Sequence, residues 1–200
     1  MEFKDAWAIV QPWEGGYVND PSDPGGETNY GISKRAFPNE DIKNMTPDRA
    51  GILMYDNYWQ PESCGNAFMP DGINLYVFDM AVNMGIDKAG RVLQAAINQV
   101  WVNNKQAGLV AIDGKIGPAT LSALMKLHPV HVLIELDGLR AYTYGTYPGF
   151  NKYGYGWERR AAYMLAHGVL ATVQPPATPV VVDRTGDLKH AITQFVDAWQ

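Results

Sequence analysis

Apolar residues recur with a helical period over most of the chain. The first such stretch predicts a helix over residues 2–14, whose apolar face carries Phe3, Ala6, Trp7, Ile9 and Val10. Pro12 has no amide hydrogen to donate and its ring crowds the preceding turn, so we expect a kink or an early end there. Gly15-Gly16 then ends the helix and leaves Glu14 on its last, irregular turn.

The pattern from residue 46 onward is almost wholly helical. Thr46-Pro47-Asp48 has the residue types of a helix start and predicts a helix to about Trp59. The segment 71–84 is apolar nearly all round, so we expect it to be a buried central helix that ends at Gly85. Further helices are predicted at 87–101, 118–127, 129–144 and 157–167, with a Gly/Tyr-rich loop at 145–156.

Residues 19–31 are rich in Gly, Pro, Asp and Asn, which favour tight turns. Tyr30-Gly31-Ile32 is expected to form a short strand beside Tyr17-Val18, and no larger sheet is predicted. The fold class is therefore mainly α, a helical bundle around a buried central helix with a small β-ribbon near the N-terminus.

The composition changes sharply near the C-terminus, where proline becomes frequent. We expect residues 1–168 to form the folded body, 169–185 an extended linker, and 186–200 an amphipathic helix. The apolar face of that helix would carry Leu188, Ile192, Phe195, Val196 and Trp199. Docking on the protein's own body is the default expectation, and another copy or a membrane surface are the alternatives.

Length and charge narrow the function classes. The chain of 200 residues has room for one domain with an appendage, and we expect a monomer. Its net charge of -5 argues against a general nucleic-acid binder, which normally has a basic face. The N-terminus lacks the pattern of a signal peptide, and no window approaches the ~20 consecutive apolar residues of a membrane span.

Glu14 is the leading candidate for chemistry. It stands between Trp13 and Tyr17 at a helix end, and a semi-apolar setting raises the pKa of a glutamate enough for it to donate a proton near neutral pH. The alternative is that Glu14 has no catalytic role and is a solvent-exposed glutamate at a helix end.

The possible partners of Glu14 lie in the loop that follows. Asp20, Asp23 and Glu27 are acidic, although Asp-Pro pairs also serve simply as turn formers. Asp23 and Thr28 are nine and fourteen positions after Glu14, so the loop can return across the helix end. An inverting glycosidase places its second carboxylate ~6.5–9.5 Å from the acid, with a water between.

Other chemistries find little support. His128, His131, His167 and His190 form no metal-binding pair with a carboxylate, and the single Cys64 cannot complete a thiolate site, so neither a metal nor a cofactor is expected. Aromatic residues gather in the predicted loops, where their faces could stack on sugar rings. The candidate substrate-binding residues are Tyr17, Asp20, Asn29, Tyr30, Trp59 and Asn83.

Four separated blocks of the sequence resemble a known family. The segment from Glu14-Gly15-Gly16-Tyr17 to Tyr30-Gly31-Ile32-Ser33 resembles the N-terminal motif of glycoside hydrolase family 108, the phage and bacterial N-acetylmuramidases related to lysozyme. Residues 78–85, 112–121 and 156–160 are similar to the predicted peptidoglycan-binding region that usually follows.

The resemblance implies a lysozyme-like fold, with a catalytic half at 1–85 and a peptidoglycan-binding helical half at 86–168. It makes Glu14 the general acid. By comparison with phage lysozymes of related fold, it suggests Asp23 and Thr28 as catalytic partners, with Asp20 as a rival for the second carboxylate. The expected protein is an endolysin that is made in the host cytoplasm and cleaves glycan strands of the cell wall after release. A lytic transglycosylase acting on the same bond and a non-catalytic wall-binding or secretion-assisting protein are the alternatives.

Overall fold

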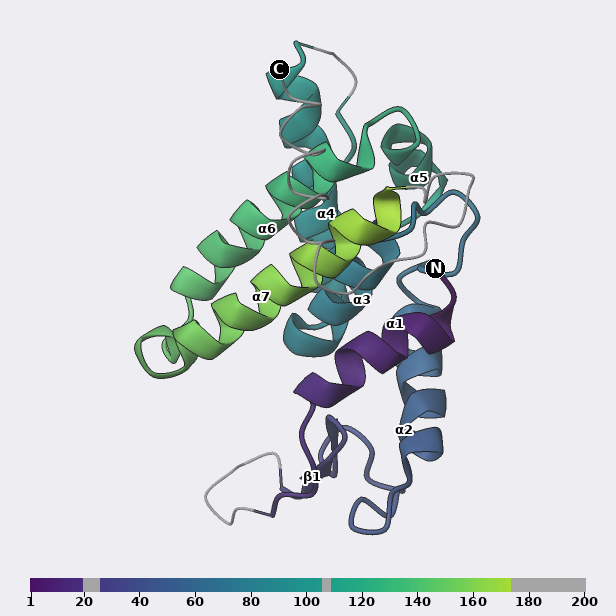
Figure 1. Cartoon of the computed structure of the whole chain (residues 1–200), viewed down its shortest axis with the longest axis vertical. Helices are drawn as coiled ribbons and strands as arrows, with labels where there is room; N and C mark the ends of the chain where they lie inside the picture. The colour runs from purple at the N-terminus through teal and green to yellow at the C-terminus, as the bar shows by residue number, and fades with distance from the viewer. Residues whose placement is uncertain (20–25, 106–108, 174–200) are drawn as a thin grey trace, which may run out of the picture.

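The computed structural model describes residues 1–19, 26–105 and 109–173. The described chain is mostly helical with a small antiparallel sheet near the N-terminus, as the sequence predicts (Figure 1). In chain order its elements are the helix α1 (Phe3–Val10), the 3-10 turn η1 (Gln11–Trp13), the strands β1 (Thr28–Asn29) and β2 (Ile32–Ser33), the helix α2 (Pro47–Met54), the π-helical turn η2 (Tyr55–Trp59), and the helices α3 (Ile73–Met84), α4 (Ile86–Asn103), α5 (Pro118–Leu124), α6 (Pro129–Gly145) and α7 (Phe150–Thr172).

The predicted central helix is confirmed as α3. Its residues from Ile73 to Ala81 are all buried, and α3 packs against α1, α4, α6 and α7. It ends at Gly85, whose φ of 91° is a conformation that glycine adopts readily. One continuous hydrophobic core joins residues from Ala6 in α1 to Met164 in α7. The helices on both sides of residue 85 therefore share a single packed interior.

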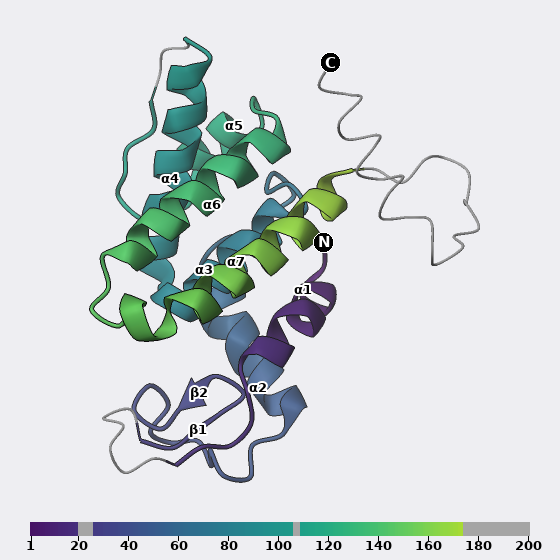
Figure 2. The same ribbon diagram turned by 60° about the vertical axis from the view of Figure 1, so that its left-hand side comes forward.

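The prediction of a Gly/Tyr-rich loop at 145–156 is wrong for most of that segment. α6 continues to Gly145, and α7 begins at Phe150 and runs antiparallel beside α6 in both views (Figures 1 and 2). Gly154 is buried inside α7, and a methyl group there would lie 2.8 Å from the ring of Phe150. Aromatic packing against α6 thus stabilises a helix that the glycines alone disfavour.

α7 also extends to Thr172, beyond the predicted end at residue 167 and into the start of the predicted linker. The remainder of that linker from residue 174 and the predicted helix at 186–200 lie outside the described residues. Among the residues that are described, no helix is both long and apolar enough to cross a lipid bilayer.

The β-ribbon pairs different segments from those predicted. Asn29 pairs with Ile32 and Thr28 with Ser33, while Val18 forms a single bridge to Thr28. The turn between the strands is made by Tyr30 and Gly31, with φ of 50° and 76°. Positive φ at both central residues matches the twist of a two-residue hairpin, so these residues form the turn and not a strand.

Candidate active site

Glu14 lies where the first helix ends. α1 stops at Val10, two residues before Pro12, and the chain continues as the 3-10 turn η1, as expected from the missing proline amide. Glu14 caps this turn, its amide bonds to the carbonyl of Gln11 at 3.0 Å, and Gly15 with φ of 69° turns the chain away. The carboxyl group is held on rigid backbone, with a side chain that is only 11% exposed.

The β1–β2 turn covers one oxygen of this carboxyl. The α-carbon of Gly31 lies so close that a methyl group added there would overlap Glu14 Oε2 and lie 2.9 Å from the terminal methyl group of Met54. A glycine is therefore favoured at position 31 by its positive φ, and any side chain there would displace the Glu14 carboxyl.

The other oxygen of Glu14 contacts an arginine from the far end of the chain. Arg160, on α7, places Nη2 at 2.5 Å from Glu14 Oε1 and donates from Nε to Asp79 Oδ1 at 2.8 Å. Asp79 is completely buried in α3 and forms a second ion pair, at 2.6 Å, with the fully buried Arg140 of α6. The buried charges thus alternate in sign from Glu14 to Arg140.

Burial is the main influence on the proton affinity of Glu14. It raises the pKa of Glu14, the charge and hydrogen bond of Arg160 oppose this, and the charge of Asp79 reinforces it, so that the pKa remains above that of a free glutamate. Tyr58 lies close enough to Glu14 to interact with it electrostatically. Burial raises the pKa of the Tyr58 hydroxyl, and the charge of Glu14 raises it further. Glu14 is a carboxyl group that retains its proton more readily than an exposed one.

Asp20 and Asp23 lie outside the described residues, so the structure gives no distance from either carboxylate to Glu14. Thr28 is partly buried in β1, where its backbone pairs with Val18 and Ser33. Its catalytic role stays a prediction.

The predicted substrate-binding residues fall in different surroundings. Tyr17 is exposed and donates its hydroxyl to Glu27 at 3.0 Å, whereas Asn29 is buried and donates to the carbonyl of Ile42 at 3.1 Å. Tyr30 packs partly against the hydrophobic core. The Asn83 side chain accepts a hydrogen bond of 2.7 Å from Tyr144. Asn29 and Asn83 thus have structural partners, and their contact with substrate stays a prediction.

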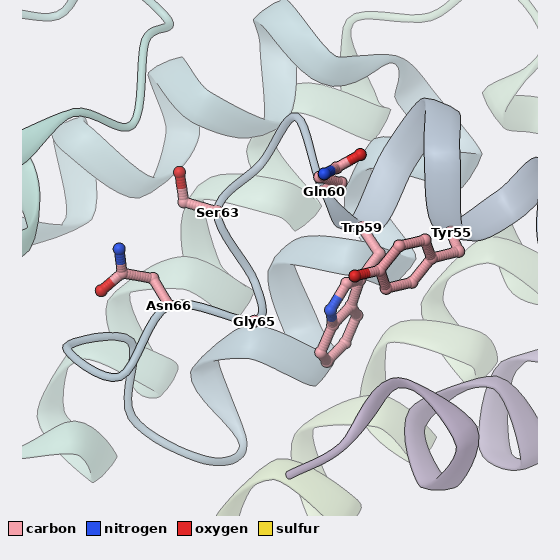
Figure 3. A pocket seen from close by; sticks show the side chains of 6 residues that line it. All are labelled: Tyr55, Trp59, Gln60, Ser63, Gly65 and Asn66. Atoms are coloured by element: carbon pink, nitrogen blue, oxygen red, sulfur yellow. The ribbon is translucent and has the colours of Figure 1, made fainter.

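Trp59 borders a pocket whose lining does not include Glu14. Its ring is 2% exposed, packs edge-on against Phe3 and Phe78, and borders a pocket of about 280 Å³ (Figure 3). The pocket is lined by Tyr55, Trp59, Gln60, Ser63, Gly65 and Asn66. Ser63 donates to the carbonyl of Ile116, and the Asn66 side-chain oxygen accepts from the amide of Phe68.

A second groove, of about 530 Å³, runs between α1 and α2 and is also lined by residues other than Glu14. In the described part of the chain no group of three His, Cys, Asp or Glu side chains could hold a metal ion. Cys64 is buried, and its burial raises the pKa of the thiol well above its usual range.

A second buried glutamate, Glu62, is the strongest rival for a proton-donating role. It is 3% exposed, and burial, reinforced by the charge of Asp87, raises its pKa to about 8. Its Oε2 has no hydrogen-bond partner, and neither described pocket is lined by it. Glu14 lines neither pocket either, so the two glutamates are distinguished by the contacts of Glu14 with Arg160 and with the hairpin turn, which Glu62 lacks.

Glu62 makes stability depend on pH. The unfolded chain has an ordinary glutamate pKa of 4.5 and the folded chain one of about 8, so between these values only the folded state keeps the proton. This contribution is fully present below pH 4.5 and falls by about 1.4 kcal/mol per pH unit until pH 8. Glu62→Gln should therefore become steadily more stable relative to the natural protein over this range, measured by urea unfolding at a series of pH values. An unchanged difference across the series would contradict the buried protonated carboxyl.

Sequence reasoning assigned no role to Arg160, Asp79 or Arg140. One signal was available, because an aspartate in a segment that is otherwise apolar all round must find a cation when it is buried. The sequence did not indicate which arginine would meet it. The burial of Glu62 could not be predicted, because nothing in the neighbouring sequence indicates it.

Two comparisons with known proteins found a similar family and a similar structure. Residues 7–85 match the family described as glycosyl hydrolase 108. Among solved structures the chain resembles that of SagA from Brucella abortus, with 27% identity, a TM-score of 0.73, and coverage of 86% of this chain and 96% of that chain. The comparison with curated proteins gives no match. The segment 7–85 includes Glu14, Gly31 and Asp79, whereas Arg140 and Arg160 lie beyond it. Residues 7–85 of this chain are thus similar to the glycosyl hydrolase 108 family, and this match supports a glycoside hydrolase.

Proposed function

We propose that this protein hydrolyses the β-1,4 bond between N-acetylmuramic acid and N-acetylglucosamine in peptidoglycan, with Glu14 as the general acid. The family match and the similarity to SagA support a peptidoglycan-degrading glycosidase. The observation that carries the finer proposal is the Glu14 carboxyl itself, which is nearly buried, has a raised pKa and is fixed between Arg160 and the hairpin turn.

The two oxygens of Glu14 have separate roles in this mechanism. Arg160 contacts Oε1, so the proton resides on Oε2 and passes to the glycosidic oxygen as the bond to the anomeric carbon breaks. Glu14 becomes negatively charged at that moment, and the adjacent Arg160 stabilises the new charge. Water then attacks the anomeric carbon, with Asp23 or Asp20 and Thr28 as the residues proposed to orient it.

Analysis of the products tests the reaction. Purified peptidoglycan digested by the protein should release fragments with N-acetylmuramic acid at the reducing end, identified by mass spectrometry after borohydride reduction. Fragments ending in 1,6-anhydromuramic acid would instead identify a lytic transglycosylase, and N-acetylglucosamine at the reducing end would identify the other glycosidic bond. Binding to peptidoglycan without any soluble product would favour a non-catalytic wall-binding protein.

The proposed biological setting is lysis of a bacterial host by a phage endolysin. The protein would be made in the host cytoplasm and reach the wall in the periplasm, or from outside, only after release. Expression inside a bacterium should then leave cells intact until the inner membrane is permeabilised, when turbidity should fall rapidly. Lysis without permeabilisation would show that the protein reaches the wall by another route.

A further inference from the structure

The C-terminal helices contact the candidate acid directly. Trp13 and Glu14 are consecutive residues, and both dock on α7. The ring of Trp13 lies 5.3 Å from that of Tyr163 and beneath the guanidinium of Arg159, and the Glu14 carboxyl meets Arg160. These α7 residues are all outside the segment 7–85 that matches the glycosyl hydrolase family. The active centre therefore includes groups from both halves of the chain.

Arg160 is itself held in place by buried charges. Its Nε and Nη2 both contact Asp79 Oδ1, at 2.8 and 2.7 Å. Asp79 is fully buried, and its other oxygen faces Arg140, which is also fully buried and bonds through Nε to the hydroxyl of Tyr144 at 2.8 Å. Removing one partner from such a set leaves a buried charge uncompensated, which is strongly unfavourable. Each of these buried charges is therefore stabilised by the oppositely charged side chain beside it.

We propose that Arg160 and Asp79 are positioning residues for the acid: Arg160 orients the Glu14 carboxyl, and Asp79 holds Arg160 and offsets its positive charge so that Glu14 can keep a proton. This inference depends on the proposed role of Glu14. It also assigns the helices after residue 85 a part in catalysis, in addition to the wall binding expected of them.

The charges around Glu14 determine the direction of each effect. Arg160 of α7 contacts it directly, Asp79 of α3 and Tyr58 of η2 interact with it electrostatically, and the hairpin turn presents a glycine. Arg140 of α6 lies behind Asp79. With Glu14 protonated, the two arginines outnumber Asp79 by one charge, and with Glu14 ionised the set is neutral. Losing a cation should therefore strengthen proton binding by Glu14, and losing the anion should weaken it.

The test is the pH dependence of kcat/KM, whose alkaline limb reports the ionisation of the acid in the free enzyme. Arg160→Gln should move this limb to higher pH and lower kcat about tenfold or more, because the carboxyl loses its orientation. Asp79→Asn should move the limb to lower pH, by about one unit. A residue that merely stabilises the fold would give no such opposite shifts.

Two further variants keep the test valid if a buried substitution prevents folding. Arg160→Lys keeps the charge and loses the planar guanidinium, so the limb should stay within a few tenths of a unit while kcat falls. The double change of Asp79→Asn with Arg140→Gln removes one charge of each sign and should return the limb towards its natural position. Arg49→Gln, which breaks an exposed ion pair with Glu40, is the matched control and should leave the profile unchanged.

Carbon NMR titration of labelled glutamate carboxyls, with the Glu14 signal assigned from Glu14→Gln, measures the same ionisation without turnover. Shifts in the same direction, or none, in folded Arg160→Gln and Asp79→Asn would overturn the positioning role. If Asp79→Asn does not fold, the double variant of Asp79→Asn with Arg140→Gln takes its place. An alkaline limb of kcat/KM in that double variant far from its natural position would overturn the positioning role. Full activity of Glu14→Gln would instead overturn the proposed function, so the two failures are distinguishable.

Discussion

Glu14→Gln is expected to lower the rate of peptidoglycan cleavage by about a hundred- to ten-thousand-fold, the usual contribution of a general acid. The amide keeps the shape of the carboxyl, so the contacts with Arg160 and the hairpin turn remain possible, but it has no acidic proton to give. Release of soluble muropeptides from purified walls measures the loss. The loss should appear in kcat, with KM nearly unchanged, because the proton is transferred only in the transition state.

Glu62→Gln is the matched control for this experiment. Both glutamates are largely buried and both have raised pKa values, but only Glu14 contacts Arg160 and the hairpin turn. Because burial raises the pKa of Glu62 to about 8, its carboxyl keeps the proton in neutral solution, and the amide resembles that state closely, so the variant should fold and cleave peptidoglycan at the natural rate. Normal activity of Glu14→Gln together with an inactive, folded Glu62→Gln would transfer the acid role to Glu62.

The parts of the site that are set by neighbouring residues could be predicted from the sequence. Pro12 ends α1 at Val10 because of its missing amide, and Gly15 turns the chain directly after Glu14. These two features place Glu14 on an irregular turn, independently of how the rest of the chain folds. The family motif agreed with this local reading and indicated the same glutamate.

The charge network could not be predicted in this way. Arg160 is 146 positions from Glu14, and nothing in either local sequence specifies that they meet. Arg159 stands beside it and makes a different contact, over the ring of Trp13. The choice between the two arginines depends on the rotation of α7 against α3, which is decided by packing along its whole length. A single helical position changes which side chain reaches the acid.

The error at 145–156 has a related cause. Glycine and tyrosine are poor helix formers, and local propensity therefore favoured a loop. In the structure Trp157 contacts the rings of Tyr144, Tyr147 and Tyr153, so aromatic residues that were considered for sugar stacking hold α6 and α7 together. Burial of aromatic surface between helices outweighs the propensity of the backbone.

Gly31→Ala is expected to lower activity about a hundred-fold, the second largest effect. Its methyl group would overlap Oε2 of Glu14, the oxygen proposed to carry the proton, and would lie 2.9 Å from the Met54 methyl group. The flexible carboxyl would move first, and a displacement of about 1 Å at a reacting group can cost a factor of this size. The positive φ of 76° adds about 1 kcal/mol of backbone strain.

Gly26→Ala is the control that separates the backbone strain of a positive φ from the overlap of a methyl group with Glu14. Gly26 also has a positive φ, of 71°, but a methyl group there would meet only the β-carbon of Lys34 at an ordinary 3.7 Å. Both variants should therefore lose similar stability in urea unfolding, while only Gly31→Ala should lose most of its kcat. Equal activity in the two folded variants would show that the turn does not constrain the acid. A hundred-fold difference would show that the hairpin turn holds the Glu14 carboxyl in the position that the reaction needs.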